Sequence, residues 1–97
     1  LETAVGIIMT DIVSEGVIDI ATMIDRMSCG PAKAFGLSGG TLSEGALGDV
    51  TVIDPDLSWT VDPNAFRSKS RNTPFTGREL KGAPHRTIVG GRTVWTR

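Results

Sequence analysis

Hydrophobic residues at the start of the chain recur every three and four positions, which is the spacing of one face of a helix. This pattern predicts an amphipathic helix that ends at Gly16, because glycine tolerates the left-handed backbone of a helix C-cap. Glu2 lies near the positive end of the helix dipole, where a carboxylate is favoured. The residues on the predicted apolar face are Val5, Ile8, Met9, Ile12 and Val13.

A second helix is predicted after Val17 and Ile18, with Asp19 as its N-cap. The Gly30-Pro31 dipeptide is expected to break it, and residues 31–35 then predict a short third helix that ends at Gly36. The side chains expected on the buried face of the second helix are Ile20, Met23, Ile24 and Met27.

In the second half of the chain the pattern changes to that of short strands. Residues 50–53 are all β-branched and predict a strand, and a turn is expected at 54–56, where a proline fixes φ. Residues 59–61 predict a second strand. Residues 63–82 predict a long irregular connection, which is uncommon unless it is functional or packed on something.

The end of the chain predicts a β-hairpin. Residues 86–89 and 93–96 flank Gly90-Gly91, and both glycines tolerate the positive φ of a tight turn. The whole chain therefore predicts an α/β organisation, with two or three helices followed by a β unit of about four strands. Because two or three short helices cannot cover one another's apolar faces completely, we expect their packing partners to lie outside the chain.

Composition limits the classes of partner. The formal net charge is −1, and no basic stripe for nucleic acid or span for a membrane is present. Part of the second half is locally basic. We interpret this part as a solvated loop in preference to a phosphate-binding surface. The residues concerned are Arg67, Lys69, Arg71 and Arg78.

Cellular location and completeness are also constrained. Cys29 is the single cysteine and cannot form an internal disulfide, and no signal peptide is evident, so we expect a cytoplasmic protein. The chain begins at Leu1, without Met and already in a helical pattern, which we expect of a segment of a longer protein.

The sequence contains no catalytic constellation. His85 is the only histidine and is expected to be structural or to face solvent, while Cys29 is expected to be a small buried hydrophobe. No Cys/His cluster predicts a zinc site, and residues 36–40 lack the lysine of a phosphate loop. The acid pairs Asp54/Asp56 and Asp11/Glu15 suit turns and solvated surfaces, and Trp59 and Trp95 are expected to be core or interface anchors. We therefore assign no catalytic, cofactor-binding or metal-binding residue.

Four motifs, in order, give the chain a family resemblance. Leu1-Glu2-Thr3 is similar to the end of a Gly-Leu-Glu-Thr motif, and residues 31–37 resemble Asn-Pro-Ala-x-x-Phe-Gly-Leu, with Gly30 in place of Asn. Residues 45–54 are similar to Gly-x-x-Ala-Asp-Leu-x-x-x-Asp, with glycine at the usual alanine. Together with residues 68–75 (Ser-Lys-Ser-Arg-Asn-Thr-Pro-Phe), these motifs resemble the C-terminal end of the cyclic amidohydrolases, and most closely the dihydroorotases.

The resemblance implies a fold larger than this chain. In that family a (β/α)8 TIM barrel carries the active site, and a small β-sandwich takes strands from both ends of the polypeptide. Residues 1–37 would be the terminal helices of the barrel. Residues 38–97 would be the C-terminal strands of the sandwich.

The resemblance also implies a reaction. A dihydroorotase is a zinc-dependent hydrolase that interconverts N-carbamoyl-L-aspartate and dihydroorotate in pyrimidine biosynthesis, with a zinc-activated water and an aspartate that shuttles the proton. Its metal ligands and that aspartate come earlier in the family's sequences, and Lys33 does not match the bridging lysine. The segment is therefore expected to be structural and inactive alone, and to bind no zinc itself. Leu1-Glu2-Thr3 is expected to support a substrate loop.

Alternatives remain open for the parent protein. Allantoinases and hydantoinases share the motifs at 31–37 and 45–54, whereas residues 1–3 and 68–75 favour a dihydroorotase. A non-catalytic dihydroorotase-like scaffold subunit is a further possibility, as is a self-standing small binding domain. The expected partners are the remainder of the chain, a small-molecule substrate, and either a second copy or aspartate transcarbamoylase.

Overall fold

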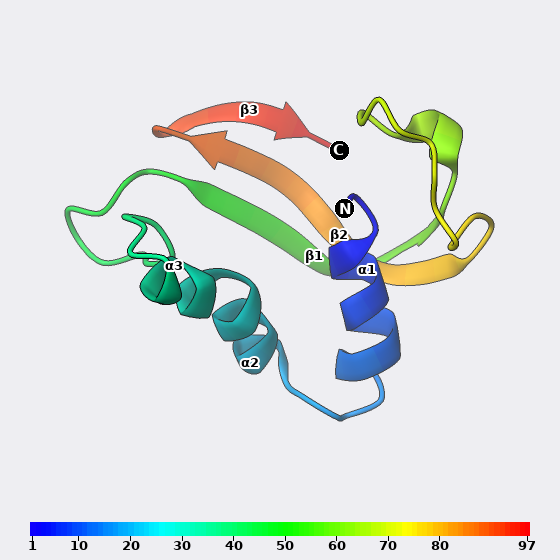
Figure 1. The fold of residues 1–97 in the computed structure, drawn as a ribbon, viewed down its shortest axis with the longest axis horizontal. Coiled ribbons are helices and arrows are strands. Elements are labelled where there is room, and N and C mark those ends of the chain that lie inside the picture. The colour runs from blue at the N-terminus through cyan, green and yellow to red at the C-terminus, as the bar shows by residue number, and fades with distance from the viewer.

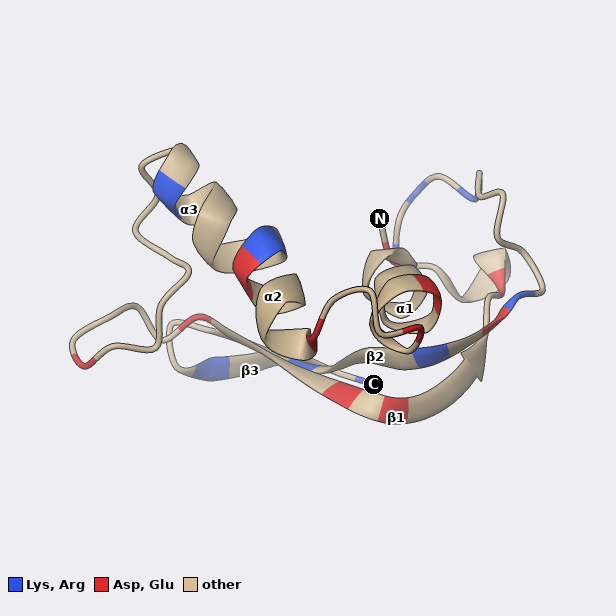
Figure 2. Cartoon of the chain, turned by 90° about the horizontal axis from the view of Figure 1, so that it is seen from below, with Lys and Arg blue, Asp and Glu red and all other residues tan.

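Helices cover one face of an antiparallel sheet in the computed structural model, which describes all of residues 1–97 (Figure 1). Seen from below, the helices lie above the sheet and leave its other face uncovered (Figure 2). The helical elements are α1 (Ala4–Ile8), η1 (Met9–Val13), α2 (Ile20–Ile24), η2 (Asp25–Cys29), α3 (Gly30–Ala34) and η3 (Pro63–Ala65). The strands are β1 (Val50–Thr60), β2 (Glu79–Val89) and β3 (Arg92–Thr96), in the order β1-β2-β3.

The predicted helix ends at Gly16 and Gly36 are confirmed. Both glycines have positive φ, 75° and 64°. After the first helix, Val17 N–H donates to the Ile12 carbonyl at 3.1 Å, a bond that spans the left-handed residue and satisfies a carbonyl of the last turn. The chain after α3 repeats this pattern around Gly36. Glycine thus ends each helical segment for the same conformational reason.

The predicted N-cap is also confirmed, because the Asp19 carboxylate accepts a hydrogen bond from Thr22 N–H at 2.7 Å. The break predicted at Gly30-Pro31 is wrong. The helical backbone continues from α2 through η2 into α3. The widened turn of η2 brings Gly30 N–H to the Asp25 carbonyl, and a Cβ at Gly30 would lie only 3.0 Å from that oxygen. Pro31 occupies the first turn of α3, where its missing N–H is tolerated.

The buried face predicted for the second helix is only partly correct. Met23 is 1% exposed, whereas Ile20, Ile24 and Met27 are 45%, 39% and 40% exposed. Ile24 and Met27 line an apolar groove that separates this helix from β1, and Ile20 lines a separate open hollow beside Ile18. The hydrophobic face is present in the sequence, but most of it has no partner within the chain.

The two strands and turn predicted over residues 50–61 are wrong, because β1 is one continuous strand of 11 residues. Asp54 pairs with Ala83, and pairing resumes where Ser58 lies opposite Lys81. Three residues of β1 therefore face a single residue of β2. The expected turn is a bulge within a strand, and the sheet has three strands instead of about four.

The bulge has a local chemical origin. Pro55 lacks the N–H that a regular ladder requires, and prolines inside sheets are found at bulges and edges. The Asp54 carboxylate accepts a hydrogen bond from Asp56 N–H at 2.9 Å, as expected for an Asp in a turn. Opposite the bulge, Gly82 has a φ of +90°. The residues that predicted a turn therefore bend the backbone locally, while pairing with β2 on both sides keeps them within one strand.

The predicted hairpin at Gly90-Gly91 is confirmed. Both residues have positive φ, 56° and 76°, which fits the two-residue turn between β2 and β3. Gly91 N–H donates to the Gly48 carbonyl at 2.8 Å, and Gly90 N–H donates to the Asp49 carboxylate at 2.8 Å. The residues just before β1 thus accept hydrogen bonds from both glycines at the tip of the hairpin. The strand β2 also includes residues 79–82, so the irregular connection is shorter than predicted.

The core of the chain is thin. Only nine of the 97 residues are buried, and large apolar side chains such as Phe35, Leu37 and Leu42 are exposed. A domain that is stable alone buries most of its apolar surface, so these faces lack packing partners within this chain. The buried hydrophobic residues are Met9, Met23, Ala32, Val61, Leu80 and Ala83. None of the helices combines the length and apolar character that a membrane crossing requires.

Candidate functional site

The most organised polar contacts of the chain lie between the first helix and the second half of the sequence. The helix itself packs closely, because a Cβ at Gly6 would lie 2.9 Å from side-chain atoms of both Leu80 and Trp59. Around this contact, Glu2, Thr10 and Asp11 each bond a residue more than 60 positions away. The first helix is therefore fixed on the sheet by close packing and by polar contacts together.

Glu2 binds the loop between β1 and β2. Its carboxylate accepts hydrogen bonds from Ser68 N–H at 2.8 Å, from the Ser68 hydroxyl at 2.7 Å and from Arg67 N–H at 3.2 Å. The hydrogen bond from the Ser68 hydroxyl, assisted by the backbone bonds, lowers the pKa of Glu2 below its ordinary value. This contact joins the two motifs, residues 1–3 and 68–75, that favoured a dihydroorotase in the sequence.

Arg71 points back into the same loop. Its guanidinium Nη1 donates to the Pro63 carbonyl at 3.1 Å and also lies within hydrogen-bond distance of the carbonyls of Phe66 and Ser68. All three carbonyls surround a single guanidinium nitrogen, which carries two N–H donors. Arg71 therefore acts as an internal brace of the loop and is not presented outward to a ligand.

Arg78 forms a two-pronged ion pair with Asp11. The distances between guanidinium nitrogens and carboxylate oxygens are 2.7 and 2.9 Å, and both side chains are partly exposed. The hydrogen bonds from Arg78 lower the pKa of Asp11, and the pair raises the pKa of Arg78. The contact fixes the start of β2 to η1.

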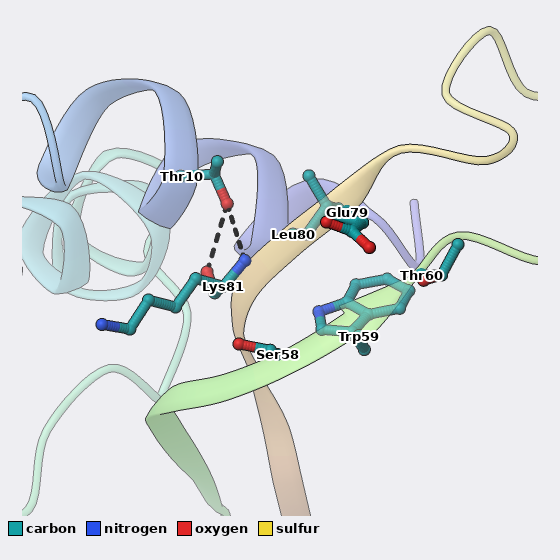
Figure 3. A pocket seen from close by; sticks show the side chains of 7 residues that line it. All are labelled: Thr10, Ser58, Trp59, Thr60, Glu79, Leu80 and Lys81. Atoms are coloured by element: carbon teal, nitrogen blue, oxygen red, sulfur yellow. Dashed lines mark hydrogen bonds between the residues drawn. The ribbon is translucent and has the colours of Figure 1, made fainter.

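A pocket of about 330 Å³ opens beside this contact region (Figure 3). Within it, the Thr10 hydroxyl bonds the backbone of Lys81, and the half-buried Trp59 indole N–H donates to the Gly82 carbonyl at 3.1 Å. Lys81 is engaged with Asp56 at 3.5 Å. The pocket offers no nucleophile in contact with a base. The lining residues are Thr10, Ser58, Trp59, Thr60, Glu79, Leu80 and Lys81.

A larger, apolar groove of about 620 Å³ separates α2 and η2 from β1. Met23, Met27 and Val50 contribute to its walls, as does Cys29. The expectation that Cys29 is buried is wrong, because its side chain is exposed on a helix that has no partner on that side. The groove is lined mainly by hydrophobic residues, and its lining suggests no reaction.

The remaining residues singled out in the sequence do not come together. His85 is exposed and is the extra residue of a small bulge, since Ile53 pairs with Pro84 and Val52 pairs with Arg86. No group of three or more His, Cys, Asp or Glu side chains is placed to hold a metal ion.

The two tryptophans and the basic residues have structural surroundings. The Trp59 ring lies next to Gly6 of the first helix. The Arg97 guanidinium lies 4.9 Å from the centre of the Trp59 ring. Trp95 is half-buried in β3. Blue and red segments are scattered along the ribbon (Figure 2), and Arg71 and Arg78 bind groups of this chain. These surroundings favour the solvated loop over a phosphate-binding surface.

Sequence reasoning missed the partners of Glu2, Thr10 and Arg71. Glu2 was placed at a helix N-terminus on dipole grounds, but its partner Ser68 lies 66 positions away. No local pattern announces a contact of that range. The available signal was indirect: the long connection at 63–82 contained polar residues that a loop needs to brace itself.

The family profile described as the amidohydrolase family matches residues 2–94, which is nearly the whole chain. The chain belongs to the amidohydrolase family. This finding confirms the resemblance drawn from the motifs.

Curated amidohydrolases with the name dihydroorotase are similar to the entire chain. The dihydroorotase of Pelotomaculum thermopropionicum is 54% identical over 94 residues, which cover 97% of this chain and 22% of that protein. The dihydroorotase of Geobacter metallireducens is 47% identical over 97 residues, covering 100% of this chain and 23% of that protein. The chain thus spans about a fifth of the length of the relatives it matches.

Solved amidohydrolase structures share the fold. The L-hydantoinase (dihydropyrimidinase) of Arthrobacter aurescens superposes with a TM-score of 0.86 at 33% identity, over 94% of this chain and 21% of that one. The dihydropyrimidinase of Brevibacillus agri superposes with the same TM-score at 25% identity, over 94% of this chain and 20% of that one. The arrangement of helices on an antiparallel sheet is therefore an amidohydrolase arrangement.

Proposed function

We propose that this chain is the C-terminal part of a dihydroorotase, a cyclic amide hydrolase that interconverts N-carbamoyl-L-aspartate and dihydroorotate in pyrimidine biosynthesis. The observation that carries the proposal is the match to dihydroorotases along the whole chain, at 54% and 47% identity. The contact between Glu2 and Ser68 supports it, because it joins the two motifs that favoured a dihydroorotase.

Within such an enzyme the chain has a structural role. We assign residues 1–37 to the last helices of a (β/α)8 barrel and residues 38–97 to the C-terminal strands of a β-sandwich, in a cytoplasmic enzyme. The exposed apolar residues of α2, and the β1 edge away from β2, are the surfaces where the remainder of the protein would pack. We expect the metal of the parent enzyme to be held by residues elsewhere, and the lack of any group of three or more His, Cys, Asp or Glu side chains placed to hold a metal ion supports this expectation.

The test is to express the full-length protein and to measure its zinc content and its hydrolysis of dihydroorotate. Hydantoin, dihydrouracil and allantoin are assayed in parallel, because solved hydantoinase and dihydropyrimidinase structures share this fold. Preference for dihydroorotate supports the proposal, and preference for another cyclic amide favours the hydantoinase or allantoinase alternative. A folded protein with no metal and no activity would instead indicate a scaffold subunit, to be tested for association with aspartate transcarbamoylase.

The chain alone provides a second test. We expect residues 1–97 to be inactive and to associate or precipitate, because the apolar helix faces and an unpaired strand edge remain exposed. Sedimentation and calorimetry measure this behaviour directly. A monodisperse monomer with a cooperative melting transition would contradict the assignment of these faces to packing against the parent.

A further inference from the structure

Residues 62–76 form a loop whose two ends meet at one point, and we call this segment the Ω-loop. Val61 N–H donates to the Arg78 carbonyl, and Gly77 N–H donates to the Val61 carbonyl, both at 2.9 Å. Val61 is 1% exposed, so the base of the loop is firmly held. Loops of roughly 6–16 residues with adjacent ends commonly fold around their own side chains.

The Ω-loop has an internal brace. Arg71 gathers the carbonyls of Pro63, Phe66 and Ser68, while the Asp62 carboxylate accepts a hydrogen bond from Asn64 N–H at 2.9 Å. All of these contacts lie within the loop. Its shape is therefore set by residues that do not depend on the first helix.

The position of the Ω-loop depends on one residue outside it. The three hydrogen bonds to the Glu2 carboxylate are the only hydrogen bonds that join residues 62–76 to the chain beyond the base of the loop. Glu2 lies just before α1, and both carboxylate oxygens are used. The start of the chain and the loop lie side by side in both views (Figure 1, Figure 2).

We propose that Glu2 is a latch that holds a separately braced Ω-loop against the first turn of the helix, so that the loop is a strap with an attached and a released state. Release leaves the helix and sheet folded, because Gly6, Thr10 and Asp11 keep α1 and η1 in place independently of Glu2. This device does not depend on the reaction that the parent enzyme catalyses.

The strap carries its own reporters. Trypsin cleaves after Arg67, Lys69 and Arg71, which all lie in the Ω-loop. Limited trypsin digestion of the full-length protein, mapped by mass spectrometry, is combined with hydrogen exchange of the loop amides. The variant is Glu2→Gln, which keeps the shape of the side chain but leaves only one acceptor oxygen for three donors. The matched control is Glu44→Gln, at an exposed glutamate that makes no hydrogen bond or ion pair.

We expect Glu2→Gln to speed cleavage or exchange within residues 62–76 by at least about tenfold, while the Glu44→Gln control leaves both rates unchanged. Equal rates in the two variants would overturn the proposal. Ser68→Ala tests the same latch if Glu2→Gln unfolds the protein, and a rise of a few fold confined to the loop is expected. If trypsin cleaved the whole chain faster in both Glu2→Gln and Ser68→Ala, the proposal would also be overturned. Glu2 would then support the fold as a whole and not the loop alone.

Arg71→Lys separates the brace from the latch. All three carbonyls surround the guanidinium nitrogen Nη1, and a lysine ammonium lies one atom closer to its backbone, so it would not reach them in the same geometry. We expect this variant to raise exchange throughout the Ω-loop, whereas Glu2→Gln raises it most at the amides of Arg67 and Ser68. Identical exchange patterns in the two variants would show that brace and latch are one unit, and the two-state strap would be rejected.

Discussion

Thr10 and Lys81 are 71 positions apart in the sequence, yet one hydroxyl satisfies both backbone groups of the lysine. The Thr10 hydroxyl accepts a hydrogen bond from Lys81 N–H at 2.9 Å and donates to the Lys81 carbonyl at 3.3 Å. A helix side chain thereby replaces the neighbouring strand that β2 lacks at this point, since β3 pairs only with residues from Arg86 onward. The contact ties the helix layer to the sheet by hydrogen bonds as well as by packing.

Replacing Thr10 with valine keeps the side-chain shape and removes the hydroxyl. We expect a loss of about 0.5–1.5 kcal/mol in the free energy of unfolding, because the Lys81 groups must then find water as a partner at a partly exposed site. Thr10→Ser is the control, since it keeps the hydroxyl. Urea unfolding of the intact amidohydrolase measures the difference, and equal midpoints for the valine and serine variants would contradict the role given to the hydroxyl.

Gly6 is a second point where the helix depends on the sheet. Alanine favours a helix by about 1 kcal/mol over glycine, but a Cβ here would lie 2.9 Å from Leu80 and Trp59 atoms. Overpacking costs about 1–3 kcal/mol, so we expect Gly6→Ala to destabilise the protein despite the gain in propensity. Gly39→Ala is the control, because nothing lies within 4 Å and its φ is not positive. A melting temperature of Gly6→Ala that is higher than that of the wild type would contradict this packing.

Gly82 and Gly77 allow backbone strain to be separated from packing. Both have positive φ, +90° and +81°, so alanine at either position carries a backbone penalty of about 1–2 kcal/mol. Only at Gly82 does the new Cβ also meet a buried side chain, with Met9 Cγ at 2.8 Å. We therefore expect Gly82→Ala to be clearly more destabilising than Gly77→Ala in denaturant unfolding. Similar losses would mean that Met9 moves aside without cost.

The Asp11–Arg78 pair makes stability depend on pH. The pKa of Asp11 is lowered in the folded protein, so its contribution is present above the ordinary Asp value of about 4 and is lost as the pH falls through the lowered value. The raised pKa of Arg78 places its own loss far above neutral pH. We expect Asp11→Asn to lower the melting temperature at pH 7, and the difference from wild type to shrink under acid conditions.

Salt and a neighbouring variant check this interpretation. Both side chains are partly exposed, so added salt should also reduce the difference between wild type and Asp11→Asn. Glu15→Gln is the control, because Glu15 lies one helical turn from Asp11 and forms no ion pair. A pH-independent effect of Asp11→Asn, or an equal effect of Glu15→Gln, would show that the ion pair does not carry the contribution.

Local patterns predicted the elements whose cause is itself local. The cap at Asp19, the helix ends at Gly16 and Gly36, and the hairpin at Gly90-Gly91 depend on a few adjacent residues, and all were found as expected. The prediction of a turn at 54–56 was wrong, because these residues favour a bend but β1 pairs with β2 on both sides of the bend. The break at Gly30-Pro31 failed because a widened helical turn accommodates the proline.

The candidate site was less predictable than the elements around it. The sequence predicted no catalytic or metal-binding residue, because it has one histidine, one cysteine and no motif with the spacing of zinc ligands, and this remains a prediction. The latch between Glu2 and Ser68 could not be inferred, because hydrogen bonds across 66 positions leave no periodic pattern. The family motifs marked both segments but did not show that they are in contact.

The sequence by itself determined the N-cap at Asp19, the helix ends at Gly16 and Gly36, the hairpin at Gly90-Gly91, and the family to which the chain belongs. Capping, glycine conformation and motifs depend on residue identity over short spans. Only the tertiary structure decided which apolar faces are covered, that β1 remains one strand, and that Glu2, Thr10 and Asp11 meet the second half of the chain. The physical reason is that packing and long-range hydrogen bonds depend on which segments become neighbours, and a strand held by its partner overrides the local preference for a turn.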